Sequence, residues 1–293
     1  MPKTSLPPSA LARQYFGGLA HVHTILSNHP HHNESNLHIT RLIELLLEEF
    51  KLEEPPLGYI LINEHSSDPD KPRPLGRLSL RGRRLLRERR RGTILGVPLL
   101  YGLEVSMLPN GKTDLTPRLA DNCALVIASR HRLPNDIERD PKHIMALFHD
   151  MCGNPAIDVI GHPLRYIDQV PGIDWQSIFE LARQTNTALE INFNNFPGSD
   201  DTAERKTVWK QWLKKLAESK APVFIGTDIH SDGQLSRFAQ LWRQIDKSDE
   251  NKLASFVMAL DSAGIGAERV ITSTPERLRA WISIDKPQRS QLS

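Results

Sequence analysis

The chain has 293 residues, of which 39% are apolar and 25% charged, and its formal net charge is +2. This composition is that of a globular protein with a large core, and it excludes a chain that is disordered throughout. No apolar run is long enough for a signal peptide or a membrane span, so we expect a cytoplasmic protein, and two cysteines cannot build a disulfide framework or a Cys-based zinc knuckle.

Short apolar runs rich in β-branched residues recur along the chain, and each predicts a strand. They span residues 18–23, 58–63, 97–105, 123–129, 157–161, 188–193 and 223–227. Segments with helical periodicity lie between most of them, at residues 39–50, 141–152, 175–185 and 203–219. This alternation predicts βαβ units with parallel strands, and seven units are enough to close a distorted (β/α)7 TIM-like barrel.

The C-terminal stretch, residues 253–282, predicts two helices around a short strand at 270–272, which could seal one end of the barrel. Barrels of this length fold as one domain. We therefore expect an N-terminal tail over residues 1–17 and a single barrel domain over residues 18–293. That domain would include a basic insertion at residues 71–96 and C-terminal helices within residues 253–293.

Metal-binding residue types stand at the ends of the predicted strands, where parallel barrels carry their functional side chains. Six of the seven runs contribute: His21 and His23, His65, Glu104, His131, His162, and Asp228 with His230. A single histidine at a strand end is more often hydrogen-bonded or solvated than a ligand, and it is the repetition that favours a metal site. Residues two apart on a strand share a face, so His21 and His23 can hold one ion together, as can Asp228 and His230. Glu104 could bridge two ions.

Seven motifs in this order resemble those of the PHP (polymerase and histidinol phosphatase) family, in its trinuclear type. They are HVHTILS (21–27), INEHSSD (62–68), GLEVS (102–106), SRH (129–131), GHP (161–163), LEIN (189–192) and TDIH (227–230). Glu64 departs from the family, which more often has aspartate before the histidine.

The resemblance implies two or three divalent transition metals, zinc, manganese or iron. A first ion would be held by His21, His23, Glu104 and Asp228, and a second by Glu104, His131 and His162. A third would be held by His29, His65 and His230. His31, His32 and His38 lie close to His29 in the sequence, and any of them could replace it.

The resemblance further implies that the protein hydrolyses phosphoesters with a metal-activated hydroxide. Asp228 or His230 could pass a proton to the leaving alkoxide. Arg165, three residues after His162, could bind the phosphoryl oxygens, and Arg130 could act in the same way. The alternative for both arginines is an ordinary surface side chain.

A basic segment within residues 71–103 carries ten cationic residues against Glu88 alone, which gives it a charge of +9 and leaves −7 on the remainder. Its densest part, from Arg77 to Arg91, is either a solvated helix face or a contact for a nucleotide or nucleic acid. The cationic residues are Lys71, Arg73, Arg77, Arg81, Arg83, Arg84, Arg87, Arg89, Arg90 and Arg91.

The leading interpretation is a phosphatase or phosphodiesterase acting on a small phosphorylated metabolite or nucleotide, with no role at a membrane. A nuclease acting on oligonucleotides through the basic segment is the alternative. A non-catalytic metal-binding module is weaker, since no ligand of the set is missing. The amidohydrolase superfamily also uses an HxH barrel, but it expects its bridging lysine or glutamate later in the chain and a final aspartate without the paired histidine.

Overall fold

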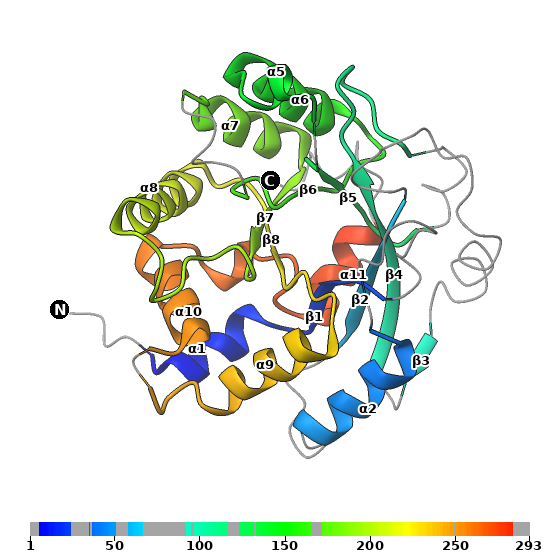
Figure 1. The fold of residues 1–293 in the computed structure, drawn as a ribbon, viewed down its shortest axis with the longest axis vertical. Helices are drawn as coiled ribbons and strands as arrows, with labels where there is room; N and C mark the ends of the chain where they lie inside the picture. The colour runs from blue at the N-terminus through cyan, green and yellow to red at the C-terminus, as the bar shows by residue number, and fades with distance from the viewer. Residues whose placement is uncertain are drawn as a thin grey trace.

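The computed structural model describes residues 6–24, 35, 37–50, 58–66, 92–94, 97–115, 123–131, 133–165, 172–248 and 250–283. Seven strands form its centre: β1 (Leu19–Val22), β2 (Ile60–His65), β4 (Val97–Ser106), β5 (Val126–Ser129), β6 (Val159–Gly161), β7 (Ala188–Asn192) and β8 (Val223–Gly226). They pair in this order, and every pair is parallel. Helices surround them (Figure 1). The predicted distorted (β/α)7 TIM-like barrel is confirmed.

The barrel closes between β1 and the segment that directly follows β8. The amide of Thr227 donates to the carbonyl of Ala20 at 2.8 Å, and the amide of His23 donates to Ile229 at 2.8 Å. The amide of Ile229 returns a longer bond of 3.3 Å to the carbonyl of His21. This seam therefore runs through the two segments that carry four of the predicted metal ligands.

The outer helices surround the strands. They are α1 (Pro8–Tyr15), α2 (Ile39–Phe50), α5 (Asn135–Glu138), α6 (Pro141–Gly153), α7 (Trp175–Thr185), α8 (Ala203–Ser219), α9 (Asp232–Arg243), α10 (Lys252–Ala263) and α11 (Pro275–Ser283). Several that are distant in sequence pack on one another: α2 on α9, α1 on α10, and α8 on α10. The four helices predicted between strands are confirmed as α2, α6, α7 and α8. Among the described residues, none of these helices is long and apolar enough to cross a bilayer.

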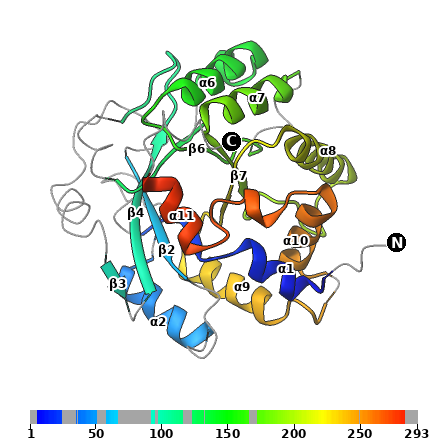
Figure 2. The same ribbon diagram turned by 180° about the vertical axis from the view of Figure 1, so that it is seen from behind.

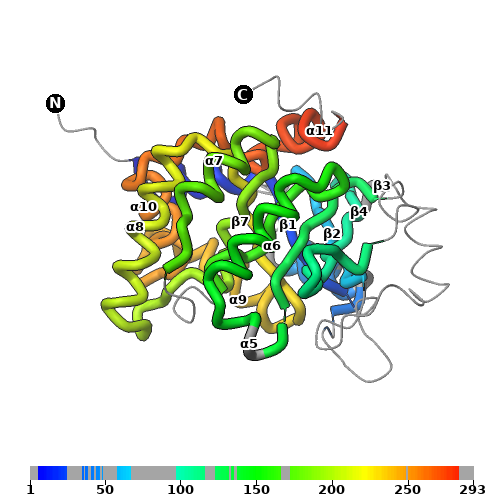
Figure 3. Tube along the Cα trace, turned by 90° about the horizontal axis from the view of Figure 1, so that it is seen from above, coloured from blue at the N-terminus to red at the C-terminus, as the bar shows by residue number. Residues whose placement is uncertain are grey.

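The amino-terminal half of the barrel interior is filled with apolar side chains. They include Ala20, Leu61, Leu100, Ile127, Val159 and Phe224 from the strands, and Ile271 and Leu278 from the C-terminal segment. Helix α11 contributes Leu278 to this cluster and lies across one end of the molecule, opposite α5 (Figures 2 and 3). A C-terminal helix therefore covers this end of the barrel, where the sequence placed one (Figure 3).

The strand predicted at residues 270–272 is wrong. Only Val270 forms a bridge, to Val223, and it follows a short 3-10 turn, η3 (Ala267–Arg269). The ladder stops because the hydroxyl of Thr272, in place of a backbone carbonyl, accepts the amide of Ile225 at 3.0 Å.

Part of the segment predicted as an N-terminal tail is instead a packed helix. In α1 the side chains of Leu11, Ala12 and Tyr15 are buried, and Pro8 at its first turn favours helix initiation. The hydroxyl of Tyr15 donates to the carbonyl of Ile265, just after α10, at 2.7 Å. Of the predicted basic insertion at 71–96, residues 92–94 form a short strand, β3 (Gly92–Ile94), antiparallel to β4, and the rest lies outside the described residues.

Arg269 ties the C-terminal segment to the end of α8. Its guanidinium donates to the carbonyls of Leu216, Ala217 and Ala221 at 2.9, 2.7 and 2.7 Å. These carbonyls belong to the end of α8 and the turn after it, where no backbone amide of a following helical turn is available to donate to them.

Replacing Arg269 with methionine is expected to lower the free energy of unfolding by about 2–3 kcal/mol, because half-buried acceptors lose a charged donor. Urea unfolding measures this change in the free energy of unfolding. The control is Arg279→Met, which removes an exposed ion pair at 3.9 Å to Glu276 and should change stability by less than about 0.5 kcal/mol. Equal effects of the two substitutions would contradict this role.

Candidate metal centre

The histidines and acids predicted at the strand ends converge inside the carboxyl end of the barrel. Eight of the nine predicted ligands belong to the described residues, and seven of these are buried: His21, His23, His65, Glu104, His131, His162 and Asp228. The eighth, His230, has a side chain that is 26% exposed. His29, His31 and His32 lie outside the described residues. His38 is exposed at the start of α2 and belongs to none of the histidine and acid groups described below.

His21 and His23 face the same two carboxylates. Glu104 Oε2 lies 3.4 Å from His21 Nε2 and 3.3 Å from His23 Nε2. Asp228 Oδ1 lies 3.7 and 3.5 Å from the same two nitrogens. Atoms bound tetrahedrally to zinc at about 2.0–2.1 Å stand roughly 3.3 Å apart, so these four donors fit around one ion. His21 Nε2 is buried and makes no hydrogen bond within the described residues, as a metal-facing nitrogen would.

The second oxygen of Glu104 faces a different pair of histidines. Oε1 lies 3.0 Å from His162 Nε2 and 3.5 Å from His131 Nε2. The other ring nitrogen of His131 is 2.9 Å from the hydroxyl of Ser106, which fixes the orientation of the ring. The two oxygens of Glu104 therefore address two sets of ligands, as a carboxylate that bridges two cations must.

A further group brings together His23, His65 and His230, each with a ring nitrogen within 4.8 Å of the others. The His23 ring stacks on those of His230 and His65, with centroids 4.1 and 4.3 Å apart. Nδ1 of His230 lies 3.0 Å from the carbonyl of Asp228, which leaves Nε2 for a metal or a proton. Two of the three residues predicted for a third ion are thus adjacent.

The sequence predicts that His21 and His23, and likewise Asp228 and His230, share a face because each pair occupies alternating positions of a regular strand. This strand geometry is wrong. Strand β8 ends at Gly226, before Asp228, and the pairing of β1 with β2 shifts register between Ala20 and Val22. The backbone is left-handed at His21 (φ 60°), Asp228 (φ 53°) and His162 (φ 25°). Such a conformation costs about 1–2 kcal/mol in a residue with a Cβ, and it aims side chains inward that a regular strand would not.

The electrostatics of the cluster suit cation binding. Burial alone would raise the pKa of Glu104, but the facing histidines, His21 first, hold that pKa well below its ordinary value. Burial lowers the pKa of His65 to about 3, and it is also the main cause that lowers the pKa of His23 well below its ordinary value. His21 differs: burial acts to lower its pKa, but the carboxylates of Glu190, Glu104 and Asp228 hold that pKa well above its ordinary value. Metal binding requires neutral imidazoles and an ionised carboxylate, so an ion at this site would displace the proton of His21.

Glu190 is a buried acid of the site that the sequence analysis did not assign. Its Oε1 lies 2.6 Å from His21 Nδ1, and its Oε2 accepts the amide of His162 at 2.5 Å. A Cβ on Gly226 would stand 1.8 Å from Oε1, so the glycine makes room for this carboxylate. An acid at the inward-facing position of an otherwise apolar strand was the available signal.

Three other residues that the sequence singled out, Arg165, Arg130 and Glu64, make contacts outside the set of metal ligands. Arg165 is exposed, and its amide donates to the carbonyl of His162 at 2.9 Å. Arg130 is buried and donates to the carbonyl of Glu138 at 3.2 Å, so the alternative of an ordinary surface side chain is wrong for this residue. Glu64 accepts both the amide and the hydroxyl of Thr24, which directs it away from the metal ligands.

Several proteins that are similar to this chain at moderate sequence identity are named as probable phosphatases. No protein-family model matches the chain. The chain is 27% identical over 191 residues to a probable phosphatase of Syntrophotalea carbinolica, a match that covers 62% of this chain and 68% of the relative. A probable phosphatase of Caldanaerobacter subterraneus subsp. tengcongensis is 27% identical over 231 residues, covering 77% and 81%. The DNA polymerase/3'-5' exonuclease PolX of Bacillus subtilis is 34% identical over 137 residues, 45% of this chain but 22% of the polymerase.

Proposed function

We propose that this chain is a metal-dependent phosphoesterase of the PHP type, carried by the barrel domain over residues 18–293 together with α1, which packs on α10. The observation that carries the proposal is the position of Glu104, whose two oxygens face two different sets of buried histidines. Relatives named as probable phosphatases support the same class of reaction.

The proposed cofactors are two or three divalent transition metals, zinc, manganese or iron. The proposed ligands of the first ion are His21, His23, Glu104 and Asp228, and those of the second are Glu104, His131 and His162. A third ion would take His29, His65 and His230. Nitrogen and carboxylate donors of this kind suit all three metals.

When bound, such ions supply a water that ionises near neutral pH and positive charge for the phosphoryl oxygens. The protein's own side chains hold and orient the reactants. In the two-metal form, in which Nε2 of His230 is not a ligand, we assign proton transfer to the leaving alkoxide to His230 in preference to Asp228, because the histidine side chain is 26% exposed and the aspartate 10%. Arg165, exposed and three residues after His162, is assigned to the non-bridging phosphoryl oxygens.

The proposed substrate is a small phosphorylated metabolite or nucleotide. A nuclease acting on oligonucleotides is the second candidate, since part of the chain is similar to a polymerase/exonuclease and the segment from Arg77 to Arg91 is strongly basic. The two candidates differ in the length of nucleic acid that they bind and cleave.

Chelation is expected to remove activity, and reloading with manganese, zinc or iron to restore it. The assay measures phosphate release from sugar phosphates, histidinol phosphate, mononucleotides and short oligonucleotides, together with the metal content of the protein. We expect release from the small phosphoesters. Cleavage confined to oligonucleotides would establish the second candidate instead.

A double substitution tests the ligands. His21→Ala with His23→Ala should lose metal and activity together. The matched control removes two histidines outside the cluster, His143 and His149, which contact Pro109 and Ser177. Full activity in the first double variant would refute the site.

A further inference from the structure

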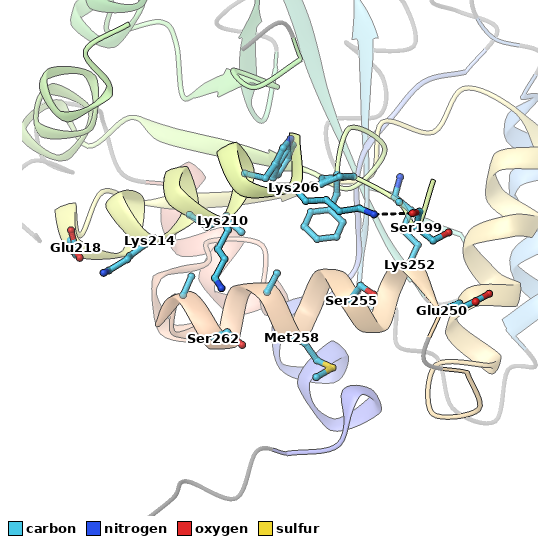
Figure 4. A pocket seen from close by; sticks show the side chains of 17 residues that line it. Ser199, Lys206, Lys210, Lys214, Glu218, Glu250, Lys252, Ser255, Met258 and Ser262 are labelled. Carbon is cyan, nitrogen blue, oxygen red and sulfur yellow. Dashed lines mark hydrogen bonds between the residues drawn. The ribbon is translucent and has the colours of Figure 1, made fainter. Parts of the chain in front are cut away.

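A groove of about 750 Å³ lies between α8 and α10, away from the metal cluster (Figure 4). That volume is within the range of small-molecule binding sites. Its apolar lining comes from both helices and from the loop after β7, and no candidate metal ligand among the described residues lines it. Met258 is 48% exposed, an unusual degree for a large apolar side chain beside a cavity. The apolar lining residues are Phe196, Pro197, Trp209, Leu213, Met258, Ala259 and Ala263.

Three lysines line the groove from one face of α8. Lys206, Lys210 and Lys214 recur every four residues, and Lys210 extends from α8 towards α10 (Figure 4). Like charges at this spacing destabilise a helix by a few tenths of a kcal/mol, so an anion along this face would stabilise α8. Glu218 and Glu250 stand at the two ends of the groove, which leaves its middle basic (Figure 4).

A fourth lysine closes one end of the groove from α10. The ammonium of Lys252 donates to the carbonyl of Asn194 at 3.1 Å and stands 5.2 Å from the centre of the Phe193 ring. Burial, with the nearby Arg237, lowers the pKa of Lys252 to about 8. A cation that is partly desolvated in this way gains more from an anionic partner than a surface lysine does.

We propose that this groove binds a small amphipathic organic anion, a function beyond the phosphoesterase proposed above. Its apolar body would lie against Met258 and Ala259, and its phosphate, sulfonate or carboxylate group would be bound by Lys210 and Lys214. Lys206 and Lys252 donate to the backbone carbonyls of Ser199 and Asn194 at 2.8 and 3.1 Å, so the anionic group is assigned to the other two lysines. The apolar lining beside them selects for an amphipathic ligand, because an inorganic anion would leave that surface uncovered.

The test is calorimetric titration of the whole protein with 1-decanesulfonate below its micellar concentration. Methanesulfonate carries the charge without the chain, and decyltrimethylammonium carries the chain with the opposite charge. We expect saturable binding of one decanesulfonate per chain and no saturable binding of the other two. The measurement does not depend on catalysis. An absence of decanesulfonate binding would therefore leave the proposed phosphoesterase activity untouched, and an absence of that activity would leave the groove proposal untouched.

Variants locate the site. Lys210→Gln with Lys214→Gln is expected to weaken decanesulfonate binding about tenfold, because two charge-assisted contacts are lost. The matched control, Lys215→Gln with Lys247→Gln, removes the same charge outside the groove and should stay within about twofold of the parent. Glutamine and lysine have similar helix propensities, so both proteins should fold alike, which circular dichroism checks.

Two results would overturn the proposal. One is equal decanesulfonate affinity in the two double variants, which would place binding elsewhere. The other is lysine-dependent binding of an acidic amphipathic peptide with no binding of decanesulfonate, which would identify the groove as a surface for a protein partner.

Discussion

Replacing Glu104 with glutamine is expected to abolish stoichiometric metal binding and to reduce phosphoesterase activity by about three orders of magnitude, since losing several kcal/mol of charge stabilisation has that effect on a rate. Glutamine keeps the shape of the side chain but loses its charge and offers one oxygen as an acceptor. Because the two oxygens of Glu104 face separate sets of histidines, both sets lose their shared partner. Elemental analysis and phosphate release measure the two effects.

Glu64→Gln is the matched control for that substitution. Glu64 is also a buried acid at the end of a strand, but its oxygens accept the amide and hydroxyl of Thr24 at 3.2 and 2.5 Å. This variant should keep its metal. A full metal complement in Glu104→Gln, or an equal loss in Glu64→Gln, would show that Glu104 does not bridge.

Replacing Glu190 with glutamine is expected to weaken metal binding about 10- to 100-fold, as the loss of an outer carboxylate does at other metal sites. One Glu190 oxygen, 2.6 Å from His21 Nδ1, keeps the proton on that nitrogen and leaves Nε2 free to bind. The other oxygen holds the backbone of His162 in its left-handed conformation. A glutamine amide can serve only one of these contacts as an acceptor.

Competition with a chelator of known affinity measures the effect of Glu190→Gln. Urea unfolding with and without metal separates this orienting role from a general loss of stability. The metal-free variant should keep the free energy of unfolding of the parent, and the increase in that free energy on adding metal should be smaller. Asp158→Asn is the control. Asp158 also accepts a backbone amide from a barrel strand, that of Val126 at 2.9 Å, but at the opposite end of the barrel. An unchanged affinity in Glu190→Gln would remove the orienting role.

The barrel could be predicted because its strands are buried on both faces and so appear in the sequence as short apolar runs. The same reasoning failed at residues 270–272, an apolar run that makes a single bridge because the hydroxyl of Thr272 replaces the next backbone acceptor. It also missed α9, although five apolar residues recur there at helical spacing, and α1, whose short apolar face packs on α10. Local pattern does not reveal which distant surface a short helix will meet.

The residues of the cluster could be predicted, but the way they meet could not. Histidine and acid residue types at strand ends identified eight positions that the structure brings together. The left-handed backbone at His21 and Asp228 was not predicted, because histidine and aspartate are enriched in this conformation but most of them do not adopt it. Glu190 was missed because its role depends on a glycine 36 positions later, Gly226, which leaves room for it.

The seam that closes the barrel has a consequence for folding during synthesis. Ala20 and Thr227, which pair across it, are separated by 207 residues. During synthesis His21 and His23 leave the ribosome long before Asp228 and His230 exist, and contacts of such separation form slowly. The set of ligands proposed for the first ion is therefore incomplete until the segment that carries Asp228 has been synthesised and has paired with β1. Selection of one metal over another by this set is expected to begin only then.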